Sequence, residues 1–386
     1  HTETGFAITG VKAYLNEEKK ENASLALLGE LDALRIPEHA YVNPETDAAH
    51  CCGHHAQMAG IFGAALALTV PEIAEKLGGQ VVFFATPAEE YGEIEFKNQL
   101  REQGKIRYGG GKCELIRTGA FDDIDLCLAH HIQPGDEIQV GSGTGNGFVS
   151  KVIRYLGKAA HAAGAPDKGV NALSAASLGL QALGLNRETF RDEDCVRVHP
   201  IITKGGNLVN VIPDEIVIET LVRAKTIEAF TDAAKKTDRS FQAGAVAMGA
   251  KVEITTLPGY LPTLAEQALP ELKRAAELAA PEVPVREAAG HSGGSTDVGD
   301  VQHLMPVYTF NTGGVKGGLH QINFEVTNEE EAYIDTAKMF ALAAYGLLKE
   351  KAARSKELVK NYKPVFKDSA EYTKFMEQFD SKEVLD

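Results

Sequence analysis

The fold is decided by three stretches near the start of the chain: SLALLGEL (residues 24–31), HAQMAGIFGAALAL (55–68) and QVVFFAT (80–86). The first and third are short apolar runs rich in Val, Leu and Phe and bounded by polar or turn residues, which is typical of buried strands. The middle stretch places apolar side chains at helical spacing, and Pro71 with Glu72 begins a second helix. Alternating strand and helix predicts an α/β fold with a mostly parallel sheet covered on both faces.

A second type of organisation follows the glycine-rich segment GDEIQVGSGTGNGF (135–148), where we place a domain boundary. Beyond it the sequence predicts a strand at 151–157, a helix at 170–184, strands at 197–204 and 214–223, a helix at 226–248 and a strand at 251–256. This α+β order is compatible with a ferredoxin-like module.

The chain then returns to its first domain. GYLPT (259–263) looks like the return linker, and residues 264–350 resume the order helix, strand and helix. We therefore expect one discontinuous domain in residues 1–145 and 260–350, and an inserted domain in residues 146–259. The charged residues 351–386 contain no motif and are expected to form an exposed helical extension.

Composition limits the class of protein. The 386 residues are 44% hydrophobic and 24% charged, they contain no long uncharged apolar run, and HTETGFAITG lacks the layout of a secretory signal. We expect a soluble, cytoplasmic protein, with an N-terminal segment preceding this start without Met. The net charge of -15 argues against nucleic acid and membrane surfaces as partners, because both are anionic. The five unevenly spread cysteines predict reduced thiols.

Residues that can bind a metal ion gather in four short segments. In order they are His50-Cys51-Cys52-Gly53-His54-His55, Thr86-Pro87-Ala88-Glu89-Glu90, Leu128-Ala129-His130-His131-Ile132-Gln133-Pro134 and Gly318-Leu319-His320-Gln321-Ile322-Asn323-Phe324. The second and third come at the ends of predicted strands, where the catalytic groups of open α/β sheets are found. Because imidazole and thiolate are natural ligands of zinc and related ions, Cys beside several His in a reducing compartment favours a metal site.

The adjacent carboxylates Glu89 and Glu90 suit a division of labour at such a site. One would bind or bridge metal, while the other would hydrogen-bond the metal's water and take its proton. Side chains that emerge next to each other at the end of a strand point in different directions, which suits two roles. Two inert acids on a solvated loop are the competing interpretation.

The order of these motifs resembles the M20 metallopeptidases, and within them the amidohydrolase branch, which includes aminobenzoyl-glutamate hydrolases, amino-acid-conjugate hydrolases and aminoacyl dipeptidases. The resemblance runs from about residue 5 to about residue 350. It implies a zinc-peptidase-like catalytic domain in residues 1–145 and 260–350, and a dimerisation or lid domain in the insertion. It also implies hydrolysis of an amide bond in a small substrate (an N-acyl or aminobenzoyl amino acid, or a dipeptide), two divalent metal ions per subunit, Zn²⁺ or Mn²⁺, and a homodimer or higher oligomer.

The resemblance assigns roles to single residues. The metal ligands of the branch correspond here to Cys52, His54, Glu90, His131 and His320, and its general base corresponds to Glu89. His161, in Gly157-Lys158-Ala159-Ala160-His161-Ala162, corresponds to a histidine that crosses the dimer and stabilises the tetrahedral intermediate. Asn210 and Arg223 correspond to substrate contacts, Ser295 follows two glycines in a loop expected to approach the substrate, and Asp32 corresponds to a carboxylate that orients the site.

Two positions depart from the branch. His55 stands where many members carry Asp or Asn, which changes the hydrogen-bonding groups near the first metal. Ser295-Thr296-Asp297 replaces the more common Ser-Glu-Asp and is closer to the aminobenzoyl-glutamate and dipeptidase members.

Two other functions stay open from the sequence alone. One is a cysteine hydrolase that uses Cys52 or Cys51 as a nucleophile with a nearby His as its base. The other is a metal-binding homologue that has lost catalysis, against which every expected ligand and the base are present.

Overall fold

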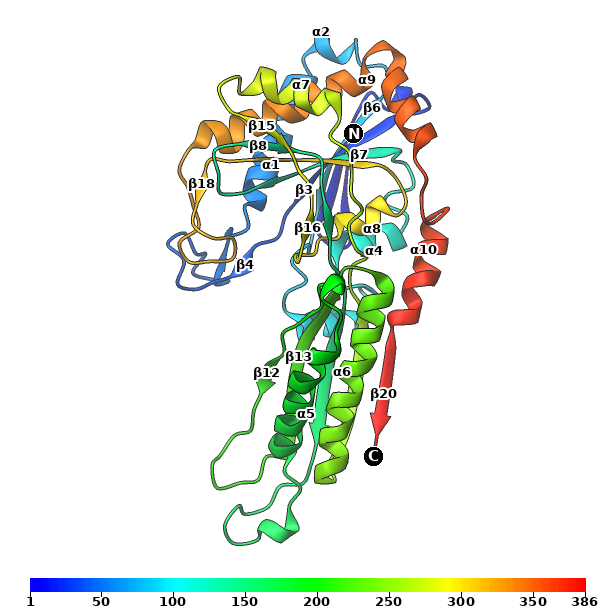
Figure 1. Ribbon diagram of the computed structural model, residues 1–386. Coiled ribbons are helices and arrows are strands. Elements are labelled where there is room, and N and C mark those ends of the chain that lie inside the picture. The colour runs from blue at the N-terminus through cyan, green and yellow to red at the C-terminus, as the bar shows by residue number, and fades with distance from the viewer.

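The computed structural model describes residues 1–386 and contains two main sheets, one in each lobe of Figure 1. The larger sheet has the strand order β1-β2-β6-β3-β7-β17-β8-β15. Its strands are β1 (Thr2–Phe6), β2 (Gly10–Leu15), β3 (Ser24–Glu30), β6 (Gln80–Thr86), β7 (Leu126–Ile132), β8 (Ile138–Val140), β15 (Val285–Glu287) and β17 (Val307–Thr312). The central strands β6, β3, β7 and β17 are parallel, whereas β2 and β8 run antiparallel to their inner neighbours. The predicted α/β fold with a mostly parallel sheet is confirmed.

Helices cover both faces of this sheet, which explains why its central strands are apolar throughout. α1 (His54–Leu68), α7 (Pro270–Ala279) and α9 (Thr336–Asn361) lie on one face, and α4 (Gly111–Arg117) and α8 (Val298–Gln302) lie on the other. Successive residues of β3 alternate between two cores, so that Leu25 and Leu27 pack on one side and Ala26 and Leu28 on the other. None of the helices has the length and hydrophobicity needed to cross a membrane.

The second sheet is antiparallel and has the order β11-β13-β10-β14-β20, with β12 also pairing with β13. Its elements are β10 (Gly147–Leu156), α5 (Ala172–Asn186), β11 (Arg197–Val198), β12 (Ile201–Lys204), β13 (Glu215–Ala224), α6 (Ile227–Met248) and β14 (Lys251–Pro258). The two helices cover one face, as expected for a ferredoxin-like module (Figure 1). The strand predicted at 197–204 is interrupted at His199 and Pro200, because proline cannot donate a hydrogen bond to the ladder.

The chain enters the second lobe between β8 and β10, leaves it after β14, and returns to it with β20. From these crossings we propose that residues 1–145 and 260–350 form one domain and residues 146–259 the other, which we call the catalytic domain and the inserted domain.

Residues 351–386 differ from the exposed helical extension that we expected. α9 continues to Asn361, α10 (Ser369–Met376) packs against α4, and β20 (Ser381–Leu385) pairs antiparallel with β14 of the inserted domain. Tyr372 of α10 is fully buried, and its hydroxyl donates a hydrogen bond to Asp300 Oδ1 at 2.7 Å. The expectation is wrong because this segment carries aromatic side chains that cover the boundary between the two domains, which its high charge concealed.

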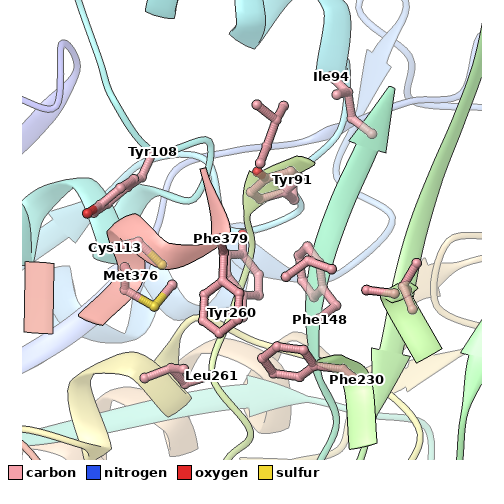
Figure 2. Packing of buried hydrophobic residues seen from close by; sticks show 14 of the residues in the cluster. Tyr91, Ile94, Tyr108, Cys113, Phe148, Phe230, Tyr260, Leu261, Met376 and Phe379 are labelled. Atoms are coloured by element: carbon pink, nitrogen blue, oxygen red, sulfur yellow. The ribbon is translucent and has the colours of Figure 1, made fainter. Parts of the chain in front are cut away.

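A continuous apolar cluster joins the domains at that boundary (Figure 2). Phe148 of β10 lies edge-on to Tyr91 of the catalytic domain, with 5.1 Å between the ring centroids, and 4.6 Å from the ring of Tyr260 in the return linker. On the same cluster, Phe379 of the C-terminal segment lies 5.3 Å from Phe230 of α6. Burial of these rings therefore holds the two domains and the C-terminal segment together.

Candidate metal centre

A tight turn places the first two metal-binding side chains at the start of α1. Cys52 precedes the helix and His54 is its first residue, with Gly53 between them at φ 83°. A Cβ atom on Gly53 would lie 2.0 Å from Cγ2 of Ile132. Only glycine fits this position, because it has the left-handed conformation and no room for a side chain.

The ends of parallel strands bring three more segments to the same place. Asp32 follows β3, Glu89 and Glu90 follow β6, and His131 lies next to the last residue of β7. Because β6, β3 and β7 are parallel neighbours, their carboxyl ends meet at one edge of the sheet. His320 reaches this edge from a loop, where its backbone N–H donates to the carbonyl of Cys51 at 2.9 Å.

The five predicted ligands converge on one centre. Sγ of Cys52 lies 3.4 Å from Nε2 of His131 and 3.2 Å from Nε2 of His320. Oε1 of Glu90 lies 3.3 Å from Nε2 of His320 and 3.8 Å from Nε2 of His54. These atoms form two groups that each fit one ion, Cys52 with His54 and His131, and Cys52 with Glu90 and His320. Cys52 belongs to both groups.

Two buried atoms of this centre lack any hydrogen-bond partner in the protein. They are Nε2 of His54 and Oε1 of Glu90, and both face the other ligand atoms. Buried polar atoms without partners cost free energy, so two such atoms aimed at one space indicate a bound ligand. Thiolate, imidazole and carboxylate donors together suit zinc, and the nitrogen and oxygen donors also suit manganese.

The charge around His54 leads to the same conclusion. Burial alone would lower the pKa of His54, but the carboxylates of Glu30 and Asp32, with Glu89 behind them, raise it to about 12. The centre therefore has more negative than positive charge until it gains a cation. A divalent metal ion supplies that charge without protonating a ligand.

Asp32 contacts two of the predicted ligands. Its Oδ2 accepts a hydrogen bond from the backbone N–H of Glu90 at 2.9 Å. Its backbone oxygen and Oδ1 lie 3.0 and 3.4 Å from Nδ1 of His54, so that Nε2 is the nitrogen directed to the metal centre. A carboxylate with such contacts can orient neighbouring ligands, which is the role that the family resemblance implies for Asp32.

Glu89 lies beside the centre and outside both ligand groups. Its carboxylate is 4.0 Å from Nε2 of His54, and only 9% of the residue is exposed. Burial, and then the charges of Glu30 and Asp297, raise the pKa of Glu89. The Tyr260 hydroxyl donates to the backbone carbonyl of Glu89 and fixes its position.

A cavity of about 570 Å³ opens over these groups and extends to the inserted domain. Arg223 and Ser295, which are predicted to contact the substrate, both line this cavity. The Arg223 guanidinium lies 5.4 Å from the centre of the Phe148 ring and donates to Oγ of Ser295 at 3.3 Å. No carboxylate of the chain forms an ion pair with it, and burial lowers its pKa. Arg223 is thus a half-buried cation that faces a cavity without an anionic partner.

The family follows from the sequence match over most of the chain. The model of Peptidase family M20/M25/M40 matches residues 26–345. This chain belongs to that family. It is a metallopeptidase-type amidohydrolase, as the order of its motifs predicts.

Individual relatives agree with the family. Xaa-Arg dipeptidase of Mus musculus is 28% identical over 325 residues, which cover 82% of this chain and 67% of that protein. N-acetyl-L-cysteine deacetylase of Bacillus subtilis (strain 168) is 31% identical over 226 residues, 56% of this chain and 49% of that protein. The crystal structure of Bacillus subtilis YxeP, a dinuclear metal binding peptidase from M20 family, matches with a TM-score of 0.58 at 22% identity and covers 90% of this chain and 87% of that chain. This last likeness shows a shared fold.

Two of the expected site residues of this M20 peptidase lie elsewhere in the chain. His161 and Asn210 are exposed in the inserted domain, and neither lines the cavity. They lie close together in loops that follow β10 and β12, where the N–H of Ala162 donates to the carbonyl of Asn210 at 3.0 Å. One chain by itself does not bring them to the metal centre.

Other residues near the centre were missed from the sequence. Nζ of Lys112 lies 2.6 Å from Glu30 Oε1 and 2.6 Å from Asp297 Oδ1, and all three side chains are buried. Two signals were present: Glu30 is a charged residue at the end of an otherwise apolar strand, and Lys112 directly follows three glycines. Neither signal indicates which residues pair.

Substitution of Gly53 by Ala tests the turn that positions Cys52 and His54. The φ of 83° and the close approach to Ile132 predict a loss of about 2 kcal/mol or more in the free energy of unfolding, with reduced metal content. Chemical denaturation and elemental analysis measure both. Gly184→Ala is the matched control, because nothing lies within 4 Å of a Cβ there and alanine favours the helix. A Gly53→Ala protein with normal stability and metal content would contradict this account.

Proposed function

We propose that this chain hydrolyses the amide bond between an acyl or aminoacyl group and an amino acid, with two divalent metal ions held by Cys52, His54, Glu90, His131 and His320. The convergence of these ligands beside Glu89, with Cys52 in both groups, is the observation that carries the proposal. The names of several relatives imply one chemistry: an Xaa-Arg dipeptidase, an N-acetyl-L-cysteine deacetylase and a p-aminobenzoyl-glutamate hydrolase each act on an amide bond to an amino acid. The ions are Zn²⁺ or Mn²⁺.

Glu89 is the proposed proton carrier. When bound, the ions would lower the pKa of a water molecule and polarise the scissile carbonyl group. Glu89 takes the proton of that water and delivers it to the leaving amine nitrogen. Its raised pKa suits this role, because a carboxylate that binds a proton more tightly is a stronger base near neutral pH.

Arg223 is the proposed partner of the substrate carboxylate. An amino acid released from such an amide carries a free carboxylate, and Arg223 faces the cavity without an anion of its own. A planar guanidinium binds a carboxylate through two parallel hydrogen bonds. Ser295 beside it would hold the guanidinium in orientation.

We also propose a homodimer formed by the inserted domain, in which His161 and Asn210 reach the partner's metal centre. β12 is an edge strand with outward apolar side chains, Ile201 at 61% and Ile202 at 45% exposure. Leu208, Val209 and Val211 are exposed in the following loop, next to Asn210. An apolar edge strand is normally covered by another chain, and a second copy would cover it here.

The cysteine-hydrolase alternative is disfavoured by the surroundings of both thiols. Burial raises the pKa of Cys52 to about 12, and Cys51 is fully buried. A cysteine nucleophile requires a lowered pKa and access to the substrate. Against the catalytically silent homologue, Glu89 is present and lies beside the ligands.

Replacing Glu89 with Gln tests the proposed function. We expect kcat to fall by about 10²- to 10⁴-fold while both ions remain bound, because the amide cannot accept the proton. The assay is a hydrolysis screen over acyl-amino acids, aminobenzoyl-glutamate and dipeptides with zinc or manganese, together with elemental analysis. Glu72→Gln, an exposed acid, is the control. Wild-type turnover in Glu89→Gln, or activity that survives chelation and is lost only on thiol alkylation, would reject the mechanism.

Arg223→Gln tests recognition of the carboxylate. We expect kcat/KM to fall by about 10- to 100-fold for a substrate with a free carboxylate, and to change little for the same substrate with that group amidated, because a charged hydrogen-bond pair is lost only in the first case. Arg197→Gln is the matched control, since Arg197 pairs in register with Arg223 on the neighbouring strand but does not line the cavity. An equal loss for both substrates would mean that Arg223 does not bind the carboxylate.

Mixing two inactive variants tests the dimer. If His161 serves the partner's site, each His161→Ala / Glu89→Gln hybrid dimer contains one complete site, and random exchange should recover about one quarter of wild-type activity. If His161 acted within its own chain, the mixture would stay inactive. Analytical ultracentrifugation establishes that the hybrids are dimers.

A further inference from the structure

Glu30 is the last residue of β3 and lies directly beside the metal centre. It is 5% exposed. Oε1 accepts a hydrogen bond from Nζ of Lys112 at 2.6 Å. Oε2 accepts from Nε2 of Gln57 at 2.8 Å and lies 3.1 Å from Nε2 of His54. Oε1 is therefore hydrogen-bonded to Lys112, whereas Oε2 faces His54, a proposed metal ligand.

The contact between Glu30 and His54 does not satisfy the imidazole nitrogen. Although Oε2 is 3.1 Å away, Nε2 of His54 has no hydrogen-bond partner, and the histidine is 1% exposed. Both atoms face the same space. Two ligand atoms bound next to each other on one ion, at metal–ligand distances of about 2.0 to 2.2 Å, lie about 3 to 3.5 Å apart. The spacing of Glu30 and His54 falls in that range.

Glu30 also completes a third group of ligand atoms. One ligand atom from each of Glu30, His54 and Glu89 lies within 4.8 Å of the other two. The ligand atoms of the two groups described above meet the same limit. His54 belongs both to this group and to the group with Cys52 and His131. The ion that His54 binds is thus adjacent to the carboxylate of Glu30.

The surroundings hold Glu30 in this position. Its backbone N–H donates to Oε1 of Gln57 at 3.0 Å, so that Gln57 fixes both the main chain and the side chain. Lys112 is fixed in turn by Asp297, which accepts from its Nζ at 2.6 Å and from its backbone N–H at 2.8 Å. A buried carboxylate needs such a partner, and Lys112 provides it on the side that faces away from His54.

We propose that Glu30 is a further ligand of the metal centre and binds the ion held by His54. This inference rests on the proposed two-metal function. Each ion would then have one carboxylate, Glu30 beside His54 for the first and Glu90 for the second. The first ion then has an oxygen donor in addition to sulfur and nitrogen.

Glu30→Gln and Asp297→Asn form a matched pair of variants. Each neutralises one of the two carboxylates that accept from Lys112 at 2.6 Å, but only Glu30 faces His54. We would measure ions bound per chain by elemental analysis, affinities by competition with a chromogenic chelator, and the visible absorption of the Co²⁺ form. Cobalt absorption depends on the ligands themselves, so it separates a ligand from a residue that acts at a distance.

We expect wild type and Asp297→Asn to bind two ions with similar affinity. Glu30→Gln should bind one ion normally and the other at least about tenfold more weakly, with a changed Co²⁺ spectrum. Two ions at wild-type affinity in Glu30→Gln, an unchanged Co²⁺ spectrum, or an equal loss in both variants would overturn the proposal.

A second variant distinguishes loss of a ligand from misfolding of the Glu30→Gln protein. Glu30→Asp keeps the charge that Lys112 requires but shortens the side chain, and it should show the same weakened ion in a folded protein. The outcome also separates this inference from the function on which it rests. A wild-type protein that fails to bind two ions rejects both, whereas two ions in wild type and an unaffected Glu30→Gln rejects only the role of Glu30.

Discussion

Buried negative charge is the constraint around which the active region of this chain is built. The carboxylates of Glu30, Asp32, Glu89 and Glu90 surround the imidazole of His54; Glu30 and Glu89 are buried, and Asp32 and Glu90 are partly buried. Charges in such surroundings must be paired or bound to a cation. Lys112 pairs with Glu30 and Asp297, and Asp32 is stabilised by a backbone N–H. The negative charge that is still uncompensated lies at the centre of the five convergent ligands, where a cation would neutralise it.

Only a few elements of the fold bring the metal-binding side chains together. Parallel strands deliver their carboxyl ends to one edge of the sheet, and the turn at Gly53 presents the thiol of Cys52 and the ring of His54 to the same edge. The inserted domain contributes Arg223 from the opposite side of the cavity. Under the proposed function, the chemistry and the recognition of the substrate carboxylate belong to different domains, which the apolar cluster around Phe148 and Tyr260 holds together.

Much of this arrangement could be predicted from the sequence because the signals are local. Apolar runs such as residues 80–86 identify buried strands, and each motif with its spacing identifies a ligand segment such as the one around Cys52. The pairing of Lys112 with Glu30 could not be predicted in this way, because 82 positions separate the two residues and neither stands in a recognisable motif. The same limit hid the packing of Tyr372, whose partner Asp300 is 72 positions away.

The position of β20 has a consequence for how the protein is made. This strand contains residues 381–385 of a 386-residue chain, yet it pairs with β14, which ends at residue 258. During synthesis, more than a hundred residues must follow β14 before β20, its neighbour in the sheet, leaves the ribosome. Domains usually fold in order as they emerge, but here the sheet of the inserted domain is completed only after residues 381–385 have been synthesised. Until then the edge of β14 is unpaired and can bind strands of other chains. Newly made chains are therefore prone to aggregate with one another.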